Sequence, residues 1–161
     1  MSLRSIPLTF IAFLLYFFVV VFSGWSEPNA EAVAAACKDA AEGCQKSFAA
    51  NNLLGTELFS VGMMSGARWS FTWGDLILLV TLVVLFAEIL KATYTSTASL
   101  VDHGLSMLVF VLALIAFLLV PQAATSVFFL IMIALLIDVI AGFTIGIRVA
   151  RRDIGFGGID T

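Results

Sequence analysis

Residues 127–147 read VFFLIMIALLIDVIAGFTIGI, an apolar run that contains a single charged residue, Asp138. The hydrocarbon core of a bilayer is about 30 Å thick and is crossed by roughly 20 helical residues. This run is therefore long enough to cross a membrane as a helix. Three further apolar runs lie at residues 6–22, 76–90 and 105–120. Together the four runs predict an all-α integral membrane protein, a bundle of four transmembrane helices.

The composition supports the same class. Of the 161 residues, 61% are hydrophobic and 12% are charged, whereas soluble domains carry about twice that charged fraction. The net charge of −3 argues against a nucleic-acid partner, because nucleic-acid binding needs a basic patch. We expect a single membrane domain whose main partner is the lipid bilayer, with no nucleic acid and no cofactor.

Local signals set the expected boundaries of the spans. Thr72 and Asp75 have the spacing of a capping box at the start of the second span. Pro121 should end the third span, because proline disfavours helix in the residue before it. We expect transmembrane helices at about residues 6–24, 72–92, 100–120 and 125–148, an outer helical segment at 25–70 and a short cytoplasmic tail at 149–161.

The first apolar run also has features of a cleaved signal peptide, with a basic start and small residues after its apolar part. Its 17 residues are more than most signal cores contain. We therefore expect the run to be kept as a transmembrane anchor.

The basic residues predict the orientation. The positive-inside rule weighs Lys and Arg close to the ends of the spans. With the N-terminus inside, the cytoplasmic side receives Arg4, Lys91, Arg148, Arg151 and Arg152. Both termini are then cytoplasmic, and residues 25–70 are periplasmic in a bacterial inner membrane. Trp25, Trp69 and Trp73 are the expected interface anchors, because indole rings favour the headgroup layer.

The outer segment is expected to be helical. Residues 26–29 have the composition of a helix start, and the residues that recur on one face after it are Val33, Cys37, Ala40, Cys44 and Phe48. We interpret this amphipathic helix as a cap on the bundle rather than as a docking site for a partner. A second apolar stretch, residues 53–64, is expected to re-enter the membrane interface before the second span.

Cys37 and Cys44 are the only cysteines. On an unbroken helix their spacing gives about 10.5 Å of rise, whereas a disulfide needs Cα atoms within about 7 Å. A disulfide therefore requires a break within residues 38–43, with Gly43 as the obvious place, and two short helices instead of one. Without a disulfide, the two cysteines are small apolar residues on a packed face.

Ala134, Asp138, Gly142 and Gly146 follow one another at four-residue steps and form a stripe on one side of the fourth span. Small residues allow close approach of membrane helices, and an acid at this depth should face the bundle interior. We interpret the stripe as a helix-packing or assembly surface, in which Asp138 bonds to a neighbouring helix. Thr81 and Ser106 are available partners.

The alternative is a proton or ion site that uses Asp138, Glu88 and His103. Glu88 and Lys91 have the spacing of a helical ion pair, and His103 titrates near neutral pH. With Asp102 and Arg148 these residues are expected at the cytoplasmic boundary, where they could equally be a structural charge cluster.

The function we favour is non-enzymatic. The sequence contains no catalytic motif and no metal-ligand spacing. We expect a structural or accessory subunit, or a scaffold, that packs with itself as a homo-oligomer or with a larger membrane complex. A small proton- or ion-linked transporter or channel component is the alternative. A membrane thiol-redox protein using Cys37 and Cys44 is less favoured, because such enzymes use a closely spaced Cys-x-x-Cys pair.

Overall fold

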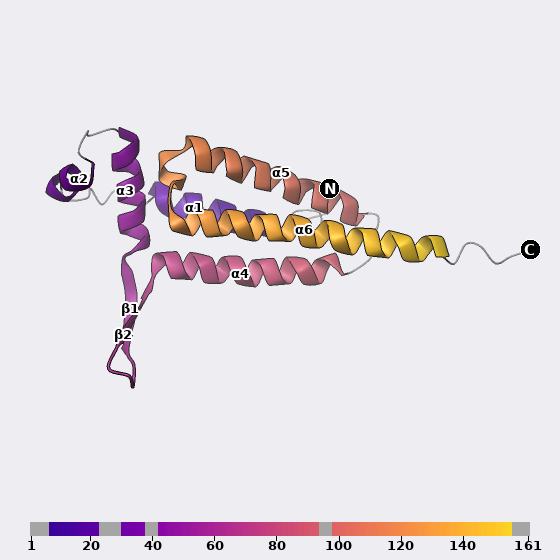
Figure 1. The fold of residues 1–161 in the computed structure, drawn as a ribbon, viewed down its shortest axis with the longest axis horizontal. Coiled ribbons are helices and arrows are strands. Elements are labelled where there is room, and N and C mark those ends of the chain that lie inside the picture. The colour runs from indigo at the N-terminus through magenta and orange to yellow at the C-terminus, as the bar shows by residue number, and fades with distance from the viewer. Residues whose placement is uncertain (1–6, 23–29, 38–41, 94–97, 156–161) are drawn as a thin grey trace, which may run out of the picture.

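The computed structural model describes residues 7–22, 30–37, 42–93 and 98–155, and structural statements below concern these residues. They are mostly helical, with six α-helices, one short 3₁₀-helix and a two-stranded hairpin (Figure 1). In chain order the elements are α1 (Thr9–Phe22), α2 (Ala30–Ala36), α3 (Glu42–Leu54), β1 (Glu57–Gly62), β2 (Arg68–Thr72), α4 (Trp73–Ala92), α5 (Ala98–Leu119), η2 (Pro121–Ala123) and α6 (Ser126–Gly155).

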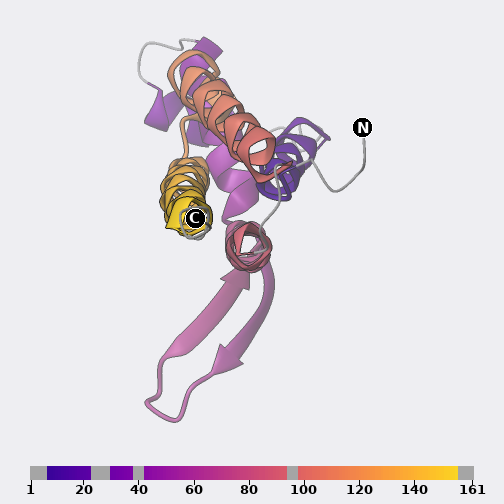
Figure 2. The same ribbon diagram turned by 90° about the vertical axis from the view of Figure 1, so that its right-hand side faces the viewer.

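Helices α1, α4, α5 and α6 lie side by side and form an elongated bundle (Figures 1 and 2). Viewed along the bundle, α4 and α5 lie on opposite sides, with α6 and α1 between them. The shared core includes Tyr16, Ile77, Phe128 and Leu135. Helices α4 and α6 run in one direction, and α1 and α5 run in the other.

The outward faces of the bundle are apolar. Two helices are long and apolar enough to cross a membrane, Trp73–Ala92 in α4 and Ser126–Arg148 in α6, while the apolar helices Thr9–Val20 and Gly104–Leu119 are shorter. Large exposed apolar side chains occur on all four helices, among them Leu14, Phe18, Leu82, Phe86, Val111, Leu118, Leu130 and Ile140.

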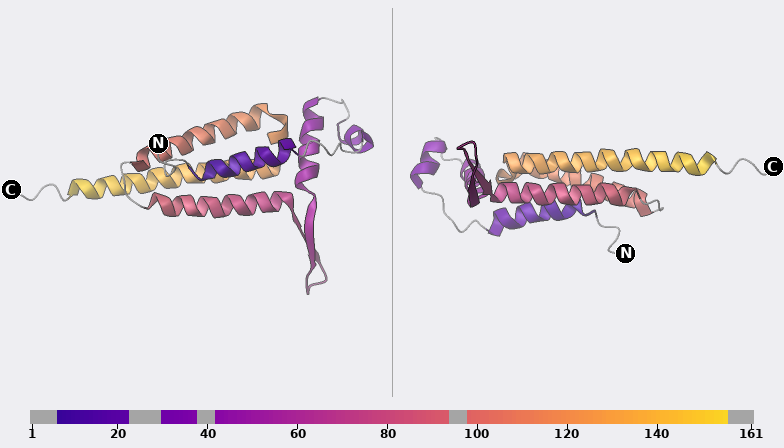
Figure 3. Two further views of the ribbon diagram at one scale, coloured as in Figure 1. Left: turned by 180° about the vertical axis from the view of Figure 1, so that it is seen from behind. Right: turned by 90° about the horizontal axis from the view of Figure 1, so that it is seen from below.

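Two local signals for helix ends agree with the structure. Thr72 and Asp75 form a reciprocal capping box at the start of α4. Helix α5 ends at Leu119, and Pro121 begins η2, as expected for a residue that cannot continue an α-helix. Helix α6 continues to Gly155, past the expected end of the span, so it extends beyond its neighbours at that end of the bundle (Figure 3).

A disulfide joins Cys37 and Cys44, whose Cα atoms are 5.9 Å apart. As a disulfide at this spacing requires, the two cysteines do not lie on one continuous helix: α2 ends at Ala36 and α3 begins at Glu42. Gly43 lies inside α3, so the expectation that the chain breaks at this glycine was wrong. The expected helix start at residues 26–29 lies outside the described residues.

Helix α3 lies across one end of the bundle, which we call the outer end (Figure 1). It packs against η2, and the Ser47 hydroxyl donates a hydrogen bond to the Ala124 carbonyl oxygen (3.1 Å). The expectation that the outer segment caps its own bundle agrees with this contact.

The all-α prediction was wrong for the part of the outer segment that precedes α4. Instead of a helical or re-entrant stretch, β1 and β2 pair as an antiparallel hairpin that projects sideways from the outer end (Figures 1 and 2). Its turn contains Gly66, whose φ of 83° favours glycine. From Phe59 onward, the large apolar residues Phe59 and Val61 alternate with the small residues Ser60 and Gly62, which is the pattern of a strand with two different faces.

Candidate functional site

Asp138 lies on α6 in the interior of the bundle, with 2% of its surface exposed. Its Oδ2 accepts a hydrogen bond from the hydroxyl of Thr9, at the start of α1 (3.0 Å). The side chain therefore links α6 to α1. The packing interpretation expected a bond from Asp138 to a neighbouring helix but did not say which one. Thr9 was not among the expected partners.

Glu88 joins the same region from α4 and is 3% exposed. Its Oε2 accepts a hydrogen bond from the Leu8 backbone N–H (2.8 Å), which has no partner within α1 because it precedes the helix. Its Oε1 pairs with the Lys91 ammonium one turn further along α4 (3.2 Å). Glu88 and Asp138 therefore bond to adjacent residues at the start of α1, Leu8 and Thr9. Two acids from different helices thus share one layer of the bundle.

Each of the four bundle helices contributes one buried polar residue at a similar depth. Thr9, Glu88, Ser106 and Asp138 each lie about 20 Å along their helix from the outer end, given the rise of 1.5 Å per residue. Ser106 is buried, and its hydroxyl has no hydrogen-bond partner within the described part of the chain. Thr81, the other expected partner of Asp138, instead donates to the Ile77 carbonyl of its own helix (2.7 Å). We call Thr9, Glu88, Ser106 and Asp138 the polar layer.

The stripe on α6 turns toward the bundle for most of its length. Ala134, Asp138 and Gly142 are buried, while Gly146 is partly exposed. The buried part of the stripe therefore packs within its own chain.

Apart from Lys91, the other predicted site residues lie away from the polar layer or are not described. Lys91 reaches it through Glu88, and Arg148 is exposed on α6. The side chains of Asp102 and His103 lie outside the described part, so the predicted cluster at the cytoplasmic boundary is seen only in its Glu88–Lys91 pair. Trp25 is likewise not described. Trp69 lies exposed on β2, and Trp73 begins α4.

A second buried polar contact lies nearer the outer end. The Tyr16 hydroxyl of α1 donates to the Gln122 carbonyl oxygen (2.7 Å) and shares a hydrogen bond with the Thr125 hydroxyl (2.6 Å). The Thr125 oxygen also accepts from the Phe128 backbone N–H (3.1 Å) in the first turn of α6. Tyr16 therefore fixes α1 to the turn between α5 and α6.

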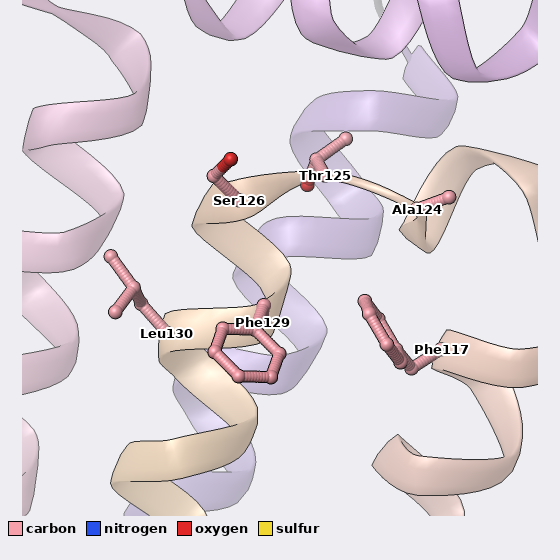
Figure 4. Close-up of a pocket in the computed structure, with 6 residues that line it drawn as sticks. All are labelled: Phe117, Ala124, Thr125, Ser126, Phe129 and Leu130. Atoms are coloured by element: carbon pink, nitrogen blue, oxygen red, sulfur yellow. The ribbon is translucent and has the colours of Figure 1, made fainter.

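An open, shallow hollow of about 480 Å³ lies beside that turn. Figure 4 shows Phe117 of α5 facing Phe129 of α6 across it, with Ser126 and Leu130 along its side. Ala124 and Thr125 complete the lining. The hollow is mostly apolar and is distant along the helices from the polar layer.

Comparison with known proteins adds no relative: no family model, no curated protein and no solved structure matches this chain.

Proposed function

We propose that this chain is an integral membrane protein in which all four bundle helices cross the bilayer. The distribution of side chains supports it: Leu14, Leu82, Leu118 and Ile140 are exposed on the four helices, while the acidic residues Glu88 and Asp138 are buried. Water-soluble monomers rarely expose apolar patches larger than a few hundred Å². In lipid the same surface is at no disadvantage.

We further propose that it acts as a non-enzymatic subunit or scaffold of a membrane complex, or of a homo-oligomer, in a bacterial inner membrane. One observation carries this proposal: the interior polar groups hold the helices to one another. Asp138 bonds Thr9 across α6 and α1, and Glu88 bonds the Leu8 N–H across α4 and α1. Such contacts give a small bundle a defined shape to present to a partner.

The test compares two substitutions at one position. Asp138→Asn keeps an oxygen that can accept from Thr9, whereas Asp138→Leu does not. After gentle extraction of the tagged chain from its native membrane, we expect Asp138→Asn to retain the native-size complex and Asp138→Leu to lose it. Co-purified proteins identify the partner. If the chain migrates as a monomer in every mild detergent and brings down no protein, the subunit proposal fails.

A second candidate function, a proton-linked transporter or channel component, is supported by a different observation. Two buried acids from different helices bond to adjacent residues at the start of α1 in one layer, which also holds the buried hydroxyl of Ser106. Ionisable residues inside membrane bundles often belong to proton pathways. This candidate requires titration at Asp138 or Glu88, which the structural role does not.

Proton flux into liposomes that contain the purified protein separates the two. Transport predicts a flux above that of empty liposomes, lost in Asp138→Asn and reduced in Glu88→Gln. The structural role predicts that Asp138→Asn preserves assembly and that no protein-dependent flux occurs. Flux that is unchanged in Asp138→Asn would remove the transport candidate.

A further inference from the structure

The hairpin has two chemically different faces. The pairs Phe59–Phe71 and Val61–Trp69 lie on one face, and the pairs Ser60–Ser70 and Gly62–Arg68 lie on the other. The rings on the first face are in mutual contact: Phe59 and Phe71 stack at 5.0 Å between centroids, and Trp69 lies edge-on to Phe71 at 5.8 Å. We call Phe59, Val61, Trp69 and Phe71 the aromatic face.

The aromatic face needs a surface to pack against. Phe59 is 51% exposed, Val61 47% and Trp69 49%. The hairpin projects away from the helices, so the bundle does not cover this face (Figure 3). A two-stranded hairpin by itself is only marginally stable in water. An apolar surface outside the described chain would therefore stabilise it.

The handedness of L-residues decides which way the aromatic face points. Consider a strand that runs upward with its partner strand on the right. In such a strand, an L-residue whose own N–H and C=O groups point to the partner has its side chain pointing toward the viewer. The Met63 N–H donates to the Ala67 carbonyl oxygen (2.8 Å), so Met63 and Ala67 form a hydrogen-bonded pair. Hydrogen-bonded pairs recur at every second position of an antiparallel ladder, so Val61–Trp69 and Phe59–Phe71 are also hydrogen-bonded pairs. In Figure 2, β2 runs up to α4 with β1 on its right, viewed from the end of the bundle where α4 ends. The aromatic face therefore points to the side on which the helices lie.

We propose that the aromatic face lies on the headgroup layer of the bilayer around the bundle, so that the hairpin is an interfacial anchor at the outer membrane surface. This inference rests on the proposed membrane placement of the bundle. The hairpin lies across the helix axes, along the expected plane of that surface (Figure 1). The helix that follows the hairpin, α4, exposes the apolar residues Leu79, Leu82 and Val83.

The chemistry of both faces fits this position. Indole and phenyl rings favour the boundary between headgroups and acyl chains. Ser60, Arg68 and Ser70 on the opposite face would point toward water, where a guanidinium keeps its hydration.

Fluorescence quenching of the full-length protein in phosphatidylcholine–phosphatidylglycerol vesicles tests the inference. Trp25→Phe and Trp73→Phe leave Trp69 as the only indole. In a matched swap variant, Trp69→Ser with Ser70→Trp moves the indole to the polar face. We expect lipids brominated near the top of the acyl chain to quench Trp69 at least about twofold more than the swapped indole. Aqueous iodide should show the reverse order.

Two results overturn the inference. Equal quenching of both indoles by brominated lipid means that the aromatic face does not contact the bilayer. Protection of Trp69 from both quenchers means that protein covers it, either a second copy or another subunit.

A separate indole distinguishes failure of this inference from failure of the membrane placement itself. Phe86→Trp, in a chain whose native tryptophans are all Phe, puts the probe on the exposed side of α4. Deeply brominated lipids should quench it. If they do not, the four-span proposal fails; if they do and Trp69 is not quenched, only the hairpin inference fails.

Discussion

Asp138 illustrates how far one residue can be understood from sequence. Its burial followed from the cost of leaving an acid in contact with lipid. Its partner did not, because Thr9 is 129 positions away and lies at the beginning of a different helix. Counting residues from the outer end of each span places Thr9, Glu88 and Asp138 at similar depths, and this count was the available signal for the contact.

Thr9→Val should destabilise the bundle, because valine keeps the volume of threonine and removes the donor to Asp138. Hydrogen bonds between membrane helices contribute about 0.6 kcal/mol on average and up to about 1.7. We expect a loss in that range, measured by reversible unfolding in mixed micelles with increasing dodecyl sulfate.

The control for this hydrogen bond is Thr144→Val. Thr144 is exposed, and its hydroxyl donates a hydrogen bond to the Ile140 carbonyl oxygen of its own helix (2.7 Å). The unfolding free energy should remain within about 0.5 kcal/mol of the parent protein. Equal losses in the two valine variants would mean that the Thr9–Asp138 bond contributes nothing specific.

Among the secondary-structure elements, the sequence predicted where two helices begin or end, but it did not predict the pairing of β1 with β2. The Thr72–Asp75 spacing located the start of α4, and Pro121 located the end of α5, because both act on the backbone next to them. The hairpin was missed because its apolar residues suggested insertion into the membrane. The alternation of Phe59 and Val61 with Ser60 and Gly62 was the available signal for a strand.

Gly74→Ala should disturb the junction between α4, α6 and α3. A Cβ at position 74 would lie 2.9 Å from Val127 Cγ2 and 3.2 Å from the Leu54 carbonyl oxygen. The backbone oxygen cannot move aside cheaply, so we expect a loss of about 1–3 kcal/mol in the same unfolding measurement.

Gly104→Ala is the matched control in another helix. A Cβ there meets nothing within 4 Å, so alanine should be neutral or stabilise α5 by up to about 1 kcal/mol. A junction that tolerates Gly74→Ala as well as Gly104→Ala would contradict the close packing of α4 on α6.

Reduction of the Cys37–Cys44 disulfide should loosen α2 without unfolding the bundle. The bond closes a short loop, for which the chain-entropy estimate is about 2–3 kcal/mol. We expect trypsin to cleave residues 30–54 faster after reductant is added, while the unfolding midpoint of the bundle changes little. The double variant Cys37→Ala/Cys44→Ala should be cleaved rapidly and equally with and without reductant. Identical cleavage of the oxidised and reduced parent would contradict a constraining role.

For the whole molecule, the directions of the bundle helices determine which segments would lie on the same side of a membrane. Helices α4 and α6 run in the same direction, so their C-terminal ends lie together, opposite the hairpin and α3 (Figure 1). If the bundle spans the bilayer, the hairpin and Arg148 must lie on opposite sides of it. The positive-inside rule then assigns the Arg148 end to the cytoplasm.

Single cysteines in a Cys37→Ala/Cys44→Ala background test this threading. Met64→Cys lies at the fully exposed tip of the hairpin, and Arg148→Cys lies on the exposed surface of α6. A membrane-impermeant thiol reagent should label Met64→Cys in intact spheroplasts and Arg148→Cys only after permeabilisation. The reverse pattern would invert the orientation and leave the bundle intact. Labelling of both without permeabilisation would contradict the crossing itself, because the hairpin at one end of the bundle and the Arg148 region of α6 at the other end would then face the same compartment.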